Sequence, residues 1–112
     1  RFCVRKDGKM IDRQMLKGVV EMALLWLVEQ QEPYGYELLR QMSERFPDLQ
    51  ERTVYAILRR LHENGDTETF TKECSGGPVR KYYRITGKGR ERLQEMIKNW
   101  RELERMIQEL GI

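Results

Sequence analysis

The hydrophobic pattern of the chain changes its period after Gly65, and this change restricts the fold more than any other feature. Before Gly65, apolar residues recur at helical spacing in three short segments. After it, residues 67–71 and 79–85 mix β-forming and polar residues in near alternation, with a turn-forming stretch at 72–78 between them. Three short helices followed by a hairpin predict an α+β, mainly helical, winged helix-turn-helix domain.

The first of the three helices is expected at about residues 13–29, with Asp12 as its N-cap. It should end before Pro33, because the residue that precedes a proline is pushed out of the α region. Its surface is apolar on several sides, so it must lie at the centre of the domain. The second and third helices are expected at about 35–45 and 51–64.

The third helix carries one apolar stripe at the spacing i, i+3, i+4, i+7, formed by Val54, Ile57, Leu58 and Leu61. Asn64 and Gly65 supply a left-handed C-terminal cap. At about 100° per residue, the surface away from the stripe is slim, polar and basic, as a helix that enters the DNA major groove requires. The candidate DNA-binding residues on this surface are Arg52, Thr53, Tyr55, Ala56, Arg59 and Arg60. The alternative interpretation is an ordinary amphipathic helix with a solvated face.

The hairpin adds basic residues to this surface. Lys72 lies near its tip, and Arg80 and Lys81 lie on its return strand. A basic loop with a Gly-Gly pair is suited to contacts with phosphate or with the minor groove. The alternative is a solvent-exposed hairpin whose basic residues only keep it soluble.

A heptad pattern covers the end of the chain, where a long helix is expected from Thr86 to about Leu110. Its apolar residues are spaced 3-4-3-4-3 and are Leu93, Met96, Trp100, Leu103, Ile107 and Leu110. One helix cannot bury such a stripe alone, so the stripe should pack on the first helix or on another subunit. The charged residues, which are 35% of the chain, also suggest that a second subunit completes some apolar surface.

Charge and composition narrow the class of protein. The net charge is +3, and residues 50–90 hold nine basic residues against five acidic ones, so the excess positive charge lies in the middle of the chain. Cys3 and Cys74 match no metal-binding pattern and are expected to be reduced thiols of a cytoplasmic protein. The longest mostly apolar run, at residues 19–28, is too short to span a bilayer. We find no arrangement typical of an enzyme active site, and we expect no cofactor and no metal.

Three motifs follow one another along the chain: Tyr34-Gly35-Tyr36-Glu37-Leu38, the segment from Thr53 to Gly65, and the segment from Gly76 to Thr86 that contains Arg80-Lys81-Tyr82-Tyr83. In order and spacing they resemble the motifs of the PadR family of transcriptional regulators. The resemblance covers Leu16 to about Leu110 and implies a homodimer that is held by the first and last helices and represses transcription at a two-fold operator of double-stranded DNA. Tyr34 and Tyr36 are candidates for phosphate contact, because the first helix of the turn motif crosses the DNA backbone. A core or capping role is an equal alternative for both tyrosines.

The sequence departs from the family pattern at two places. Asp66 and Thr67 stand where an apolar pair usually enters the wing, and Gly87 replaces a polar helix former. Both departures predict a looser wing or a looser start of the last helix.

Trp100 is the candidate effector-binding residue. The short C-terminal helix resembles the smaller, LmrR-like subgroup of the family, in which a tryptophan at this place faces its symmetry mate and the paired indoles stack on planar aromatic drugs. The other candidate effector-binding residues are Met22, Trp26 and Met96. The alternative is that Trp100 only fills the dimer seam.

These interpretations divide the chain into three parts: a flexible or non-native segment at residues 1–12, a DNA-binding domain at 13–86 and a dimerisation helix at 87–112. The expected dimer interface consists of Leu16, Val20, Leu93, Met96, Trp100, Leu103, Ile107 and Leu110. The alternative function is a winged-helix protein-interaction module without an operator. Salt dependence separates the two, because DNA binding weakens steeply with salt and an apolar interface does not.

Overall fold

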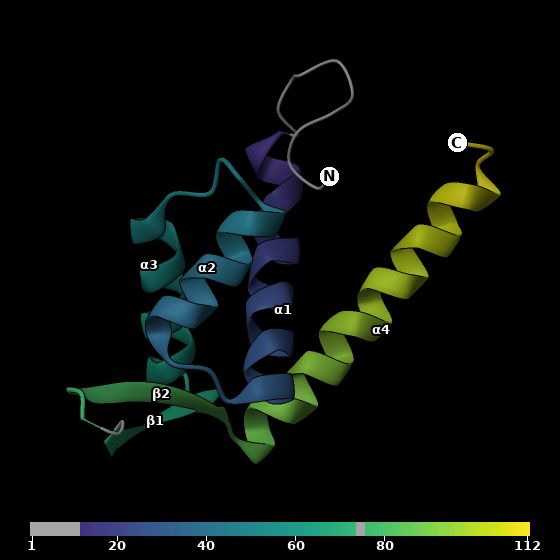
Figure 1. Cartoon of the computed structure of the whole chain (residues 1–112). Coiled ribbons are helices and arrows are strands. Elements are labelled where there is room, and N and C mark those ends of the chain that lie inside the picture. Colours follow the sequence, from purple (N-terminus) through teal and green to yellow (C-terminus); the bar gives the residue numbers. More distant parts are fainter. Residues whose placement is uncertain (1–11, 74–75) are drawn as a thin grey trace.

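The computed structural model contains four helices and one two-stranded antiparallel sheet among the residues that it describes, 12–73 and 76–112 (Figure 1). The elements are α1 (Arg13–Gln31), α2 (Gly35–Arg45), α3 (Glu51–Glu63), β1 (Thr67–Glu73), β2 (Val79–Ile85) and α4 (Gly87–Glu109). The order confirms the expected winged helix-turn-helix fold. The predictions made for residues 1–11, Cys3 and Cys74 lie outside the described residues.

The helix ends follow the local signals in the sequence. Asp12 caps α1 through its side chain, whose Oδ1 accepts a hydrogen bond from the backbone N–H of Gln14 at 2.7 Å. At the other end Glu32 adopts a left-handed conformation (φ 47°) just before Pro33 and ends the helix, two residues later than predicted. Gly65 follows α3 with φ 82°, a value that favours glycine, and thereby turns the chain into the wing.

The two strands pair from Thr67 opposite Ile85 to Glu73 opposite Val79, so β1 extends two residues beyond its predicted end. The wing is joined to the start of α2, because the backbone N–H of Tyr83 donates to the carbonyl of Pro33 at 2.9 Å. A single bridge between Tyr34 and Tyr82 adds to this attachment. The wing therefore has a fixed place relative to the three helices.

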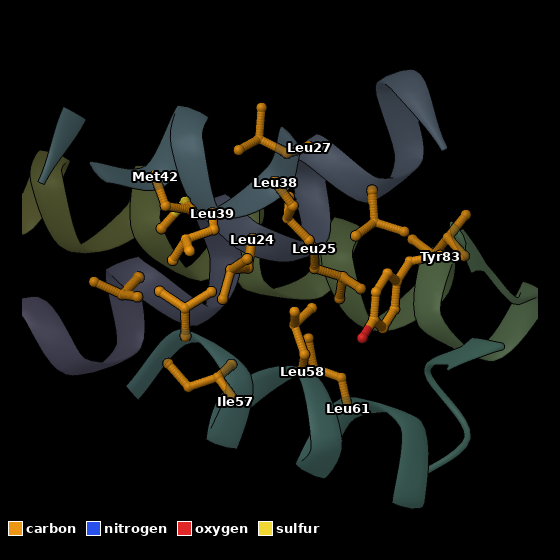
Figure 2. Packing of buried hydrophobic residues seen from close by; sticks show 14 of the residues in the cluster. Leu24, Leu25, Leu27, Leu38, Leu39, Met42, Ile57, Leu58, Leu61 and Tyr83 are labelled. Carbon is orange, nitrogen blue, oxygen red and sulfur yellow. The ribbon is translucent and has the colours of Figure 1, made fainter. Parts of the chain in front are cut away.

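The core lies where α1, α2 and α3 meet, and β2 closes one side of it (Figure 2). Figure 2 shows Leu24 and Leu25 of α1 between Leu38 of α2 and Leu58 of α3, with the ring of Tyr83 from β2 beside them. The four leucines are almost completely buried. Burial of a leucine side chain contributes about 1.5–3 kcal/mol, so this layer is the main source of the domain's stability.

Helix α4 begins against the core and then extends away from it. Leu93, near its start, is completely buried, whereas Leu103 is 52% exposed, Ile107 is 41% exposed and Leu110 is 75% exposed. In Figure 1 the beginning of α4 lies beside α1 and its yellow end stands apart from the rest of the molecule. The heptad stripe is therefore buried at one end only.

Asp66, at the junction between α3 and the wing, was expected to loosen the wing. Its side chain is 1% exposed, and its Oδ2 pairs with Arg92 of α4 at 3.0 Å, while its Oδ1 has no hydrogen-bond partner among the described residues. The hydroxyl of Thr86 accepts a hydrogen bond from the backbone N–H of Gly89 at 3.0 Å, so α4 begins at Gly87 with a side-chain cap. Arg92 supplies the opposite charge that a buried carboxylate needs, and the expected looseness stays a prediction.

Within residues 12–73 and 76–112, no helix is both long enough and apolar enough to cross a membrane.

Candidate nucleic-acid interface

Helix α3 presents its basic residues to solvent because its apolar stripe is fully used by the core. Val54, Leu58 and Leu61 are at most 1% exposed, which fixes the rotation of the helix about its axis. All the α3 residues predicted to bind DNA are consequently exposed: Arg52, Thr53, Tyr55, Ala56, Arg59 and Arg60. The structure thus places this part of the predicted site on a single outer surface.

Two hollows run along α3. One, of about 600 Å³, lies between the start of α1, the α2–α3 loop and α3, and includes Thr53, Ala56 and Arg60 in its wall. The other, of about 580 Å³, is a shallow depression that includes Arg52, Tyr55 and Arg59. The outer surface of α3 is therefore flanked by open space on both sides, which is the access that a groove-reading helix needs.

Arg59 and Arg60 differ in their surroundings. Arg59 has no acidic partner among the residues that the structure describes. The guanidinium of Arg60, in contrast, donates to the carboxylate of Glu21 in α1 at 2.5 Å. Sequence reasoning missed this pair because its members are 39 positions apart.

The basic residues of the wing lie over aromatic rings. Lys72 and Arg80 are opposite each other in the strand register. The ammonium of Lys72 is 5.2 Å from the ring centre of Tyr82, and the guanidinium of Arg80 is 4.5 Å from that of Tyr34. Cation–π contacts of this kind hold the cations in place while their outer sides stay open to solvent. They present two positive charges on one face of the wing.

Lys81 points to the other face, where its ammonium lies 5.9 Å from the ring centre of Tyr83. Tyr83 itself is 7% exposed, so this tyrosine of the pair Tyr82-Tyr83 faces the core. Burial, with a smaller contribution from the nearby Tyr55, raises the pKa of the Tyr83 hydroxyl. Tyr83 is therefore a neutral, structural residue at physiological pH.

Tyr34 and Tyr36 are placed differently. Tyr34 is half-buried between Arg80 and Tyr82, with its ring centre 5.6 Å from that of Tyr82, so it supports the wing. Tyr36 is 64% exposed at the start of α2 and is free to contact a phosphate. The structure brings Tyr34 and Arg80 together and leaves Tyr36 as the outward residue of the pair.

The residues predicted for the dimer interface fall into two groups. Val20 is 3% exposed and Leu93 is completely buried, so both belong to the core of a single chain and offer almost no surface to a second one. Val20 lines the hollow between α1 and α3. The place of these two residues in a dimer interface stays a prediction. The remaining interface candidates are half-buried or exposed: Leu16, Met96, Trp100, Leu103, Ile107 and Leu110.

The residues predicted to bind an effector lie on α1 and α4. Met22 and Met96 pack against the edge of the core, Trp100 is half-buried, and Trp26 is 46% exposed. Neither of the two hollows along α3 is lined by any of them. In a single chain Trp26 is thus exposed and Trp100 is partly open to solvent.

The described residues contain no group of three or more acidic, histidine or cysteine side chains that could hold a metal ion. A helix-turn-helix whose exposed α3 surface is basic, followed by a wing with cations on its outer face, defines a winged-helix protein of the DNA-binding class. Residues 24–95 match the family described as "Transcriptional regulator PadR-like family". This match spans more than half of the chain, and the chain belongs to the PadR-like family of transcriptional regulators.

Solved structures agree with this assignment. A PadR-like transcriptional regulator from Bacillus cereus is 39% identical, with 87% of this chain and 95% of that chain covered and a TM-score of 0.79. A Streptococcus transcriptional regulator is 30% identical over 90% of this chain and all of that chain, with a TM-score of 0.82. A curated relative from Lysinibacillus sphaericus, described as "Uncharacterized protein X", is 33% identical over 88% of this chain and 93% of its own length.

Membership of a family of transcriptional regulators also means that the protein is a DNA-binding regulator and not an enzyme.

Proposed function

We propose that the protein is a homodimeric repressor that binds a two-fold DNA operator through α3 and the wing of each subunit. The observation that carries the proposal is that one chain combines an exposed basic α3 surface with an apolar α4 stripe whose second half is exposed among the residues that the structure describes. Residues 13–86 then bind DNA and residues 87–112 join two copies. A repressor of this kind acts in the cytoplasm, where its DNA lies.

The dimer follows from the cost of exposing the stripe. Leu103, Ile107 and Leu110 repeat at the heptad spacing, and a second helix with the same spacing covers such a stripe by knobs-into-holes packing. The indole of Trp26 on α1 is also exposed, and a partner that packs on it would likewise remove apolar surface from water. A second copy of this chain is the partner that supplies a matching stripe, and it makes the interface self-complementary.

On DNA, the paired α3 helices enter successive major-groove faces about 34 Å apart. Arg59 and Arg52 bind phosphate or a guanine edge, while the small side chain of Ala56 allows the helix to approach the base edges closely. Lys72 and Arg80 of the wing meet the adjacent backbone, and Lys81 and Tyr36 contribute from the flanks. Thr53 donates to phosphate.

An effector site forms at the dimer axis in this proposal. Trp100 stacks on a planar aromatic molecule together with its symmetry mate, and Met22, Trp26 and Met96 complete the walls. Titration of the protein with planar aromatic compounds should quench the tryptophan fluorescence, and Trp100→Ala should abolish that quenching. An absence of quenching in the unchanged protein would remove the effector from the proposal and leave the repressor intact.

The operator tests the proposal as a whole. Selection from a random-sequence duplex library should enrich a pseudo-palindrome with half-sites one helical turn apart. The affinity for the enriched duplex should fall steeply as salt rises. Failure to enrich any sequence, together with an affinity that salt does not change, would favour the protein-interaction module. In a reporter strain, deletion of the regulator should raise expression from the enriched operator; lowered expression would make it an activator.

A further inference from the structure

Glu21 of α1 contacts two other helices with one carboxylate. Its Oε2 accepts from Arg60 of α3 at 2.5 Å and its Oε1 accepts from Arg92 of α4 at 2.6 Å. The side chain of Glu21 is only 12% exposed, whereas those of Arg60 and Arg92 are 51% and 37% exposed. The carboxylate therefore lies inside the junction of the three helices, and the two arginines reach in from its rim.

Arg92 continues the network to the base of the wing. Its second nitrogen pairs with the Asp66 carboxylate at 3.0 Å. The backbone of Asp66 is also held, because its N–H donates to the carbonyl of Leu61 at 2.9 Å and its carbonyl accepts from the N–H of Thr86 at 3.1 Å. A network of ion pairs thus links α3, α1, α4 and the start of the wing through Arg60, Glu21, Arg92 and Asp66 in that order.

We propose that Glu21 is a positioning residue for DNA reading: it fixes the orientation of α3 and the wing relative to α1 and α4. This inference rests on the proposed function, in which α1 and α4 join the two subunits and α3 and the wing read DNA. Because the spacing of two α3 helices must match the spacing of two half-sites, a small rotation of α3 against α4 in each subunit lowers the affinity for the operator.

The low exposure of Glu21 makes its two ion pairs difficult to break. A carboxylate of low exposure that has lost an arginine partner is strongly disfavoured, so the pairs resist separation. The same pairing makes Arg60 a structural residue, since its guanidinium is occupied on the α1 side. Arg60 thereby acts on DNA through the placement of α3, and its predicted direct contact becomes secondary.

The chain offers a matched control in Glu29. Its carboxylate accepts from Arg90 of α4 at 3.1 Å and is 19% exposed, so Glu29 also joins α1 to α4 through an arginine. It differs from Glu21 in having no hydrogen bond or ion pair to α3 among the described residues. Glu21→Gln and Glu29→Gln therefore remove the same charge from the same helix, but only Glu21→Gln breaks an ion pair to α3.

The experiment compares the full chain with these two variants on two probes, the enriched operator duplex and a mixed-sequence duplex of equal length. Glu21→Gln should lower the operator affinity about tenfold, which corresponds to about 1.4 kcal/mol. It should leave the mixed-sequence affinity and the dependence of affinity on salt unchanged, because no phosphate contact is lost. Glu29→Gln should leave the operator affinity within about twofold of the unchanged chain.

A second pair of variants keeps the test independent of stability. Arg92→Gln also leaves the buried Asp66 carboxylate without its partner, so its loss should be at least as large as that of Glu21→Gln. The double variant should lose little more than Arg92→Gln alone, since the groups act as a unit. Thermal melting of every variant identifies the temperature at which all are folded, and binding is measured there.

Equal losses for Glu21→Gln and Glu29→Gln, or an unchanged operator affinity in Glu21→Gln, would overturn the inference. An affinity gain with a steeper salt dependence would overturn it too, because Glu21 would then mask Arg60 from phosphate. Failure to enrich any operator would instead contradict the proposed function itself.

Discussion

Helices α3 and α4 carry the same kind of apolar stripe, but the chain uses the two stripes differently. In α3, Leu58 and Leu61 are at most 1% exposed, so the stripe is entirely buried by the chain's own helices. In α4, the stripe begins at the buried Leu93 and ends at Leu110, which is 75% exposed. An apolar stripe on a charged helix thus shows that a partner is needed without showing which chain supplies it.

This difference separates stability from assembly. The α3 stripe holds the domain together, so its loss should affect a single chain at any concentration. The exposed part of the α4 stripe should matter only when a second copy is present, so its loss should depend on concentration. Variants in the two helices can test this separation directly.

The largest effect is expected for Ile107→Glu in α4. A carboxylate in an apolar helix–helix seam loses its hydration without gaining a partner and should prevent pairing of the two copies. Because a single copy can occupy only one half-site, the operator affinity should fall about a thousandfold or more, which corresponds to about 4 kcal/mol. A binding titration on the enriched duplex measures the change.

Gln108→Glu is the matched control, since it places the same side chain one residue away on an exposed position of α4. It should change the operator affinity only slightly. Similar losses in both variants would mean that charge on α4, and not the seam, governs binding.

The next largest effect is expected for Leu58→Ala in α3. Its side chain is 1% exposed, and truncation of such a leucine leaves a cavity that costs about 2–5 kcal/mol of unfolding free energy. Urea denaturation should show this loss at every protein concentration. A loss that grows on dilution would indicate that the α3 stripe takes part in assembly.

A smaller effect is expected for Arg59→Ala on the exposed side of α3. Arg59 is exposed, so its truncation should change the thermal melting temperature by no more than about a degree. Each subunit loses one phosphate contact, so the operator affinity should fall at least about tenfold and the slope of affinity against salt should fall by about two per dimer. An unchanged affinity at fixed salt would show that α3 lies elsewhere on the duplex.

The smallest effect concerns pH and the ion network beside the two helices. Burial raises the pKa of the Glu21 carboxyl, but hydrogen bonds and charge from Arg60 and Arg92 outweigh burial and lower it below the usual value of 4.5. A group of this kind contributes stability that is present above its unfolded-state pKa and is lost as the pH falls through its folded-state pKa. Denaturation at about pH 6 and about pH 3 should therefore show a smaller acid loss in Glu21→Gln than in the unchanged chain. Equal losses would contradict the ion pairing.

The local sequence signals predicted the elements well. Asp12, Pro33 and Gly65 act on their own backbone or that of near neighbours, so the ends of α1 and α3 follow from residues that lie close in the sequence. The buried stripe of α3 was equally readable, because helical geometry alone turns Arg52 and Arg59 outward once the stripe is buried.

The ion network escaped sequence reasoning for the opposite reason. Glu21 pairs with Arg92 over 71 positions, and nothing near either residue distinguishes this pair from the many other charges of the chain. The burial of Asp66 was not foreseen for the same reason, since its arginine partner is brought close only by the packing of α4. The α4 stripe is a further case. Its heptad spacing indicates that a partner must cover it, but the spacing alone does not identify the partner, because that depends on packing between distant residues or between chains.

Sedimentation equilibrium of the unmodified chain is the decisive measurement of whether two copies pair through α4. The unmodified chain should sediment with twice the 13.5 kDa mass of one chain at micromolar concentration, and Ile107→Glu should convert it to the single-chain mass. A single-chain mass for the unmodified protein at every concentration would contradict this pairing, because the exposed end of α4 would then need no second copy.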